Sequence, residues 1–198
     1  MEIDNLFTPL PPSFYQQPTL KLAKALLGCL LVHETEDGTA SGVIVETEAY
    51  LGSTDRAAHS YQNRRTKRTE VMFGSAGLAY THTMHTHCLI NVVSGGEGAP
   101  ESVLIRAVEP YSGIDLMLKR RPVEKMQNLT SGPGKLTKAL GISMKDYGRT
   151  LYEPPLFIAK GIAPSRITQG KRIGIGNAGE AKDYPLRFWI PGNRYVSR

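Results

Sequence analysis

Apolar runs of strand length, separated by turn residues, recur along this chain and restrict its fold more than any other feature. The clearest pair is CLLVHET (29–35) and TASGVIVETEAY (39–50), joined by Asp37-Gly38, and an Asp-Gly pair between such runs is a strong β-hairpin signal. Further strands are expected at 78–84, 88–94, 102–110, 156–161, 172–176 and 186–190, and helices at 18–27, 112–119 and 133–140. Hairpin-connected strands with few helices predict a mixed α/β (α+β) fold around an antiparallel sheet.

The composition is that of a folded, basic protein. Apolar residues make up 40% and charged residues 21% of the 198 residues, which excludes an intrinsically disordered chain. The formal net charge is +6, and such a balance permits binding to nucleic acid without proving it. No change of composition marks a domain boundary, so residues 1–198 are expected to form a single domain.

Cysteine usage and the absence of targeting signals bear on the cellular location. Cys29 and Cys88 have no partners at metal-ligand spacing, and two cysteines are too few for a small disulfide-stapled secreted protein. The first ten residues lack a basic start followed by an apolar stretch, and no run approaches the roughly 20 apolar residues that span a bilayer. We therefore expect reduced thiols and a cytoplasmic protein without membrane association, at the nucleoid if the source is bacterial.

The most informative stretch is VIVETEAYLGSTDRAAHS (43–60). Its apolar first half predicts a buried strand, and side-chain alternation places Glu46, Glu48 and Tyr50 on one face. His59 lies close enough along the chain to fold back toward them. Carboxylates and an aromatic ring on a buried strand form a rigid platform for chemistry. On spacing alone, however, a strand end that leaves the core with solvated carboxylates is the more common meaning.

Four cations follow in the segment RRTKR (64–68). A charge run usually marks a solvated face. Here it comes directly after the acid-plus-aromatic platform, where a phosphate backbone would have to be held, and Lys and Arg supply affinity for DNA through phosphate contacts. Arg64, Arg65, Lys67 and Arg68 are therefore candidate DNA-binding residues.

Three segments in order, VETEAYLGSTDRAAHS, NRRTKRTEVMF and LIRAVEP, resemble the alkyladenine (3-methyladenine) DNA glycosylase family. The likeness continues in LPPSFYQQPTLKLAKALLGCLLV, SGPGKLTKALGI and RIGIGNAGEAKDYPLRFWIPGNRYVS, so it covers nearly the whole chain. ETEAY followed by DRAAHS is far more specific than an isolated motif. The resemblance implies a monofunctional enzyme that flips a damaged purine out of duplex DNA and hydrolyses its bond to deoxyribose.

The resemblance also implies roles for single residues. Glu48 matches the general base that activates water, with Glu46 as the rival carboxylate; a carboxylate can also stabilise the positive charge that develops on the sugar. Tyr50 and His59 match residues that stack on and contact the flipped base. Because alkylated purines carry a positive charge, aromatic faces should hold them better than neutral purines.

Two further positions match the family's pocket. Asn91, in LINVV, matches an asparagine of the pocket floor, where its side chain would clash with the exocyclic amine of guanine and so exclude that base. Arg106, in LIRAVEP, matches an arginine directed at the phosphate region of the flipped nucleotide. A buried structural salt bridge is the alternative role for Arg106.

The chain departs from the family between Tyr80 and Asn91, where it reads YTHTMHTHCLIN and is one residue shorter. Relatives place an aromatic residue at the position of His82 and a tyrosine that wedges into the base stack near His85. His82 can still stack on the base, and Met84 or His85 can act as the wedge. Which of these two residues intercalates is left open.

Three other interpretations compete with this one. His82, His85 and His87, with a glutamate, suggest zinc, but strand alternation puts 82 on the other face from 85 and 87. The pattern G-x-G-x-x-G at 174–179 lacks the βαβ unit that a dinucleotide site needs. A non-enzymatic nucleic-acid-binding module with a formyltransferase-like barrel explains the charge and the strands, but gives Glu48 no role.

The sequence therefore predicts a single α+β domain, with a curved antiparallel β-sheet, surrounding helices and a protruding β-hairpin near residues 78–94 that enters DNA. The expected partner is double-stranded DNA containing damaged purines of the 3-methyladenine, 7-methylguanine, hypoxanthine and ethenoadenine class. Hydrolysis would leave an abasic site. We expect a monomer that needs no metal and no other cofactor.

Overall fold

The computed structural model of the chain describes residues 7–197. The helices are α1 (Pro12–Tyr15), α2 (Thr19–Ala25), α3 (Ile114–Arg120) and α4 (Pro133–Leu140). The strands are β1 (Leu30–Thr35), β2 (Gly38–Tyr50), β3 (Ala79–Met84), β4 (His87–Ser94), β5 (Glu101–Ser112), β6 (Leu156–Ala159), β7 (Thr168–Gly170) and β8 (Arg187–Trp189). The expectation about a leader segment concerns the first ten residues, of which 1–6 lie outside this description.

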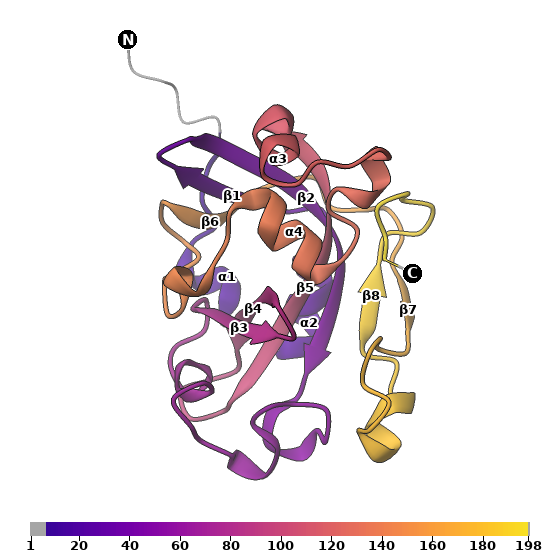
Figure 1. Ribbon diagram of the computed structural model, residues 1–198. Coiled ribbons are helices and arrows are strands. Elements are labelled where there is room, and N and C mark those ends of the chain that lie inside the picture. The colour runs from indigo at the N-terminus through magenta and orange to yellow at the C-terminus, as the bar shows by residue number, and fades with distance from the viewer. Residues whose placement is uncertain (1–6, 198) are drawn as a thin grey trace.

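The described strands join in one curled antiparallel sheet, which confirms the predicted fold class (Figure 1). The order along the sheet is β3-β4-β5-β2-β1-β6, with β8 added to β2 and β7 to β8. β1 and β2 form the hairpin that the Asp-Gly turn predicted, with Leu30 opposite Val43 and Thr35 opposite Gly38. α4 packs against β4 and β5, while α2 packs against β2 and β5.

β2 is the longest strand, and both of its edges are paired. One edge pairs with β5 along most of its length. The other edge pairs first with β1 and then, around Glu46–Glu48, with β8. The β2–β5 register is irregular on both sides of Glu46. The half of β2 that carries the candidate carboxylates is therefore held between two strands, a setting that fixes side chains rigidly.

The main core lies between the sheet and its helices. It contains fully buried side chains from every layer, including Leu22, Leu26, Ile44, Ile105 and Leu136. Burying each such side chain contributes about 1.5–3 kcal/mol relative to leaving it in water. This core holds α2, β2, β5 and α4 together, and β2 carries the carboxylates of the candidate site.

Gly28 follows α2, as its role as a helix stop predicts. It has a φ of +88°, and a Cβ built there would lie 2.1 Å from the carbonyl oxygen of Ile162. Only glycine allows both this left-handed conformation and this close approach. The chain can therefore turn directly from α2 into β1.

β3 and β4 form a hairpin where one was predicted, near residues 78–94, and residues 83–87 at its tip are exposed. Its two strands pair from Ala79 opposite Val92 to Met84 opposite His87. At the tip, His85 has a φ of +53°, an uncommon value for a residue with a side chain, and Met84 is 41% exposed. The hairpin thus presents an apolar and an imidazole side chain at an exposed turn.

The prediction of a strand at 172–176 is wrong. This segment is irregular, and the nearest strand is the short β7. Gly174 has a φ of +77°, and the N–H of Ile173 donates to Glu48 instead of to a neighbouring strand. The helix expected at 133–140 is confirmed, and the other two are displaced or shortened by one to two residues.

Among residues 7–197, no helix is long and apolar enough to cross a membrane. Both cysteines are free thiols in the structure, as expected.

Candidate active site

Glu48 lies at the centre of a buried hydrogen-bond network. Its side chain is inaccessible to solvent, and its Oε1 accepts from the N–H of Ile173 at 2.8 Å while its Oε2 accepts from the Tyr50 hydroxyl at 2.8 Å. Arg106 Nη1 lies 3.4 Å from Oε1. Burial raises the pKa of Glu48 above its ordinary value, although Arg106 and the hydrogen bonds oppose the rise. The carboxyl group is therefore more basic than an ordinary glutamate.

Glu46, the rival carboxylate, is fully buried and bound on all sides. Its Oε1 accepts from Arg106 Nε, Arg187 Nε and Ser197 Oγ at 3.3, 2.7 and 2.9 Å, and its Oε2 accepts from the Ser197 N–H at 2.7 Å. Oε1 therefore accepts from three donors and Oε2 from one, and all four donors belong to Arg106, Arg187 and Ser197. Neither Glu46 nor any of these three partners lines the small cavity described below.

Arg106 lies inside the same network. Its side chain is 9% exposed and contacts both carboxylates as well as Ser197. Of the two roles considered for Arg106, the structure therefore places it in a buried salt bridge. Contact between Arg106 and a phosphate of the flipped nucleotide stays a prediction.

A small cavity of about 60 Å³ lies beside this network. Its lining includes the four residues predicted for the base pocket, Tyr50, His59, His82 and Asn91. It also includes Tyr80 from β3 and Met84, one of the two candidate wedge residues. Ligand pockets usually span about 300–1,000 Å³. A purine can therefore occupy this site only after some of the lining side chains move.

The two histidines of the cavity are interlocked with Tyr80. The His82 ring stacks on Tyr80 with centroids 5.0 Å apart, and the His59 ring meets His82 edge-on at 4.7 Å. Arg68, which can only donate, lies 3.2 Å from His59 Nε2, so His59 Nδ1 carries the proton and donates to the Tyr80 hydroxyl at 2.7 Å. Both ring nitrogens of His59 are therefore engaged.

Asn91 fixes the remaining imidazole. Its amide nitrogen donates to the Tyr80 carbonyl at 3.1 Å and lies 3.2 Å from His82 Nδ1, which therefore accepts. Burial lowers the pKa of His82 to about 3 and that of His59 to about 4, so both rings are neutral at pH 7. Neutral rings do not repel a cationic ligand.

Tyr50 is braced from behind by a buried ion pair. The Arg172 guanidinium lies 4.6 Å from the centroid of the Tyr50 ring and donates to both oxygens of Asp55 at 2.5 and 2.8 Å. It also donates to the carbonyls of Ala49 and Ala181. The loop after β2 and the segment before β8 are thereby tied together around Tyr50.

The cation run expected to hold phosphates lies on exposed surface beside the cavity. Arg65 is committed to Glu70 through two hydrogen bonds of 2.9 and 2.6 Å, and Arg68 contacts His59. Arg64 and Lys67 are exposed. Among residues 7–197, only Arg65 of these four cations forms an ion pair with a carboxylate, so the other three keep their charge available beside the cavity.

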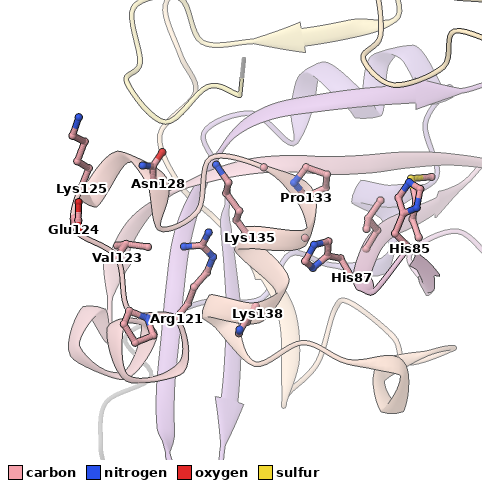
Figure 2. A pocket seen from close by; sticks show the side chains of 15 residues that line it. His85, His87, Arg121, Val123, Glu124, Lys125, Asn128, Pro133, Lys135 and Lys138 are labelled. Atoms are coloured by element: carbon pink, nitrogen blue, oxygen red, sulfur yellow. The ribbon is translucent and has the colours of Figure 1, made fainter.

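A larger groove of about 980 Å³ runs between the hairpin tip and the segment from α3 to α4. Figure 2 shows Lys135 and Arg121 projecting between this segment and His87. The cations that line the groove are Arg121, Lys125, Lys135 and Lys138. Gly134 allows the close contact at the floor, because a Cβ there would lie 2.7 Å from His87 Cβ. The groove is therefore basic and open beside the exposed hairpin tip.

The groove cations and Tyr80 were not among the residues predicted for the site. Alternation along AYTHT places Tyr80 on the same face as His82, so Tyr80 could have been found. The groove cations are scattered between residues 121 and 138, and no sequence signal joins them to the hairpin.

The zinc interpretation finds no support in the described residues. Among residues 7–197, no group of three or more His, Cys, Asp or Glu side chains is placed to hold a metal ion. His82 is buried in the cavity, whereas His85 and His87 are exposed at the hairpin tip. The glycine pattern at 174–179 lies in irregular backbone and a 3-10 turn, not in a βαβ unit.

Comparison with known proteins identifies the family of this chain. The model of the family described as methylpurine-DNA glycosylase (MPG) matches residues 13–194. A protein of Oceanobacillus iheyensis is 67% identical over 198 residues, covering all of both chains. Proteins of Bacillus licheniformis and Bacillus subtilis are 67% and 63% identical over 190 residues, covering 96% of this chain and 97% of theirs.

All three relatives bear the name "Putative 3-methyladenine DNA glycosylase". The family match covers far more than half of the chain and includes every candidate site residue named above, except Ser197. The chain therefore belongs to the methylpurine-DNA glycosylase family, whose members are DNA-repair hydrolases.

Proposed function

We propose that this DNA glycosylase flips alkylated or deaminated purines out of duplex DNA and hydrolyses the N-glycosidic bond with water activated by Glu48. The substrates would be purines of the 3-methyladenine, 7-methylguanine, hypoxanthine and ethenoadenine class. The products are a free purine and an abasic site.

The observation that carries the proposal is the unequal state of the two carboxylates. Glu46 accepts from Arg106, Arg187 and Ser197, none of which lines the cavity. Glu48 accepts from the Ile173 N–H and from Tyr50, which does line the cavity, and has one longer contact with Arg106. Glu48 is therefore the carboxylate linked to the cavity, and each of its oxygens accepts only one hydrogen bond, which leaves acceptor capacity for water. Its raised pKa also makes it a better general base than an ordinary glutamate.

The cavity chemistry supports a cationic or aromatic base as ligand. Tyr50 presents an aromatic ring next to Glu48, and the imidazoles of His59 and His82 are neutral. An alkylated purine carries a positive charge that aromatic faces attract. As the glycosidic bond breaks, positive charge also develops on the sugar, and the Glu48 carboxylate stabilises it.

Two surfaces support a duplex partner. The exposed Met84 and His85 at the hairpin tip are suited to fill the space that the flipped nucleotide leaves in the base stack. The basic groove lies on one side of this tip and the exposed cations of 64–68 lie by the cavity. Cations around a wedge hold the two phosphate backbones of a bent duplex without reading its sequence.

The test compares Glu48→Gln with the wild-type enzyme on a duplex that carries one hypoxanthine or alkylated purine. Glutamine keeps the size of the side chain but cannot take a proton from water. We expect the rate of base release to fall at least about 10²-fold, because a general base typically contributes about 10²–10⁴-fold to the rate. Affinity for the lesion duplex should be retained. Release at the wild-type rate would refute the role of Glu48.

A matched control is Asp146→Asn, which changes another buried carboxylate to an amide in the short turn that follows α4. It should retain base release once correct folding is verified. A loss as large as that of Glu48→Gln would show that the rate reports on stability and not on catalysis.

A further inference from the structure

The buried network behind Glu48 includes Ser197, which follows β8 and is 6% exposed. Arg106 Nε and Nη2 donate to the Ser197 hydroxyl at 3.3 and 3.2 Å, and this hydroxyl donates to Glu46 Oε1 at 2.9 Å. A hydroxyl has one proton to donate and two lone pairs to accept. All three positions of this hydroxyl are therefore used to join Arg106 to Glu46.

Arg106 is held through one edge of its guanidinium. Nε and Nη2 face Ser197, and Nε also donates to Glu46, so Nη1 is the nitrogen left for Glu48, 3.4 Å away. The guanidinium is planar and rigid. Fixing Nε and Nη2 therefore fixes the direction of Nη1.

The backbone of Ser197 secures the same arrangement. Its N–H donates to Glu46 Oε2 at 2.7 Å, and its carbonyl accepts from Arg187 Nη2 at 3.2 Å. Arg187 in turn donates to Glu46 and lies over the ring of Trp189. The segment after β8 is thus pinned to β2 and β8 next to the candidate catalytic residue.

We infer that Ser197 is a positioning residue, which orients Arg106 so that the Nη1 atom faces Glu48. The inference rests on the proposed function, in which Glu48 activates water. Ser197 itself does not line the cavity and takes no part in bond breaking.

The inference predicts a change in the pH profile. A general base works when deprotonated, so the rate falls as the pH drops through its pKa. Arg106 lowers the pKa of Glu48 against the effect of burial, so a misdirected Arg106 leaves that pKa higher. The acid limb of the rate profile should then move to higher pH.

The other charged or titratable groups facing Glu48 and its partners are Glu46 and Tyr50 on β2, Arg187 on β8, and Arg172 with Asp55 behind Tyr50.

The experiment compares Ser197→Ala with Ser197→Thr in single-turnover base release across pH. We expect Ser197→Ala to lower the maximal rate about tenfold, the effect of losing one hydrogen bond to a charged group, and to move the acid limb upward. Affinity for the lesion duplex should stay at the wild-type value. Ser197→Thr keeps the hydroxyl and should restore the wild-type limb.

Ser41→Ala is the matched control. Ser41 is also fully buried and bonds another side chain, the Ser112 hydroxyl at 2.7 Å, but lies seven residues before Glu48 on β2, roughly 23 Å along the strand. It should lose stability without any shift of the limb. The same shift in Ser41→Ala, or a wild-type profile in Ser197→Ala, overturns the inference.

Two further measurements separate the possible failures. Titration of the Glu48 carboxyl carbon by NMR in wild type and Ser197→Ala reads the pKa directly, without turnover, and an unchanged value overturns the inference. If Ser197→Ala does not fold, Ser197→Cys, with a weaker donor and acceptor, should give an intermediate shift, and a wild-type profile there also overturns it. If Glu48→Gln releases the base at the wild-type rate, the proposed role of Glu48 is refuted, and this inference is refuted with it.

Discussion

Replacing Asp55 by Asn, which removes one partner of the buried ion pair behind Tyr50, should destabilise the protein far more than replacing one partner of an exposed ion pair. Asp55 and Arg172 form a two-pronged ion pair in which the side chains are 1% and 0% exposed. Asp55 also accepts from the N–H groups of Leu51 and Ala57, so it organises the loop after β2. Asparagine has nearly the same shape but lacks the charge and one acceptor.

The expected cost follows from burial. Removing one partner of a buried ion pair costs about 3–5 kcal/mol, because the other charge stays buried without compensation. Arg172 keeps two carbonyl acceptors, those of Ala49 and Ala181, so we expect the lower end, about 3 kcal/mol of unfolding free energy. For a chain of this size, each kcal/mol lowers Tm by about 2–4 °C, which gives a fall of roughly 6–12 °C.

The assay is urea and thermal unfolding of Asp55→Asn beside Glu70→Gln. The Arg65–Glu70 pair has the same two-pronged geometry but is exposed, with side chains 59% and 55% accessible. Water and salt screen such a pair, so Glu70→Gln should leave the midpoint almost unchanged. A loss of less than about 1 kcal/mol in Asp55→Asn would refute the reasoning from burial.

Three other predictions concern base release and DNA binding. Because burial raises the pKa of Glu48, single-turnover base release should decline as the pH is lowered, with a midpoint above the pKa of an ordinary glutamate. A rate that does not change with pH on the acid side would contradict this prediction. Tyr50→Ala should weaken selective binding to lesion duplex by about 1–3 kcal/mol, whereas Tyr50→Phe should retain most of it; equal losses in titrations would argue against stacking. Replacing Lys135 and Lys138 by Gln should reduce the salt slope of DNA binding by about 0.9 for each phosphate that these lysines neutralise, and a wild-type slope would remove the groove from the interface.

Local patterns in the sequence predicted most elements of the fold. The Asp-Gly hairpin, the long strand that ends in Glu48 and the helix at 133–140 all follow from short-range turn chemistry and periodicity. The segment 172–176 did not follow, because its alternating isoleucines look like a strand. Instead, the Ile173 N–H donates to Glu48 and the Arg172 side chain donates to Asp55. These partners lie 125 and 117 positions away in the chain.

The candidate site was predictable where a resemblance or strand alternation applied. Alternation along β2 places Glu46, Glu48 and Tyr50 on one face, and their shared contacts confirm it. The difference between the two carboxylates was beyond the sequence, because it depends on Arg187 and Ser197, which approach from the far end of the chain. Long-range contacts of this kind leave no local pattern.

The most direct test of the central claim is base release by the wild-type protein from a duplex with a single hypoxanthine, followed by detection of the free base and of the alkali-labile site. We predict stoichiometric free hypoxanthine and an abasic site, with the strand intact until alkali is added. Binding to the duplex without release of any base would contradict the claim, and would favour a nucleic-acid-binding module that performs no chemistry.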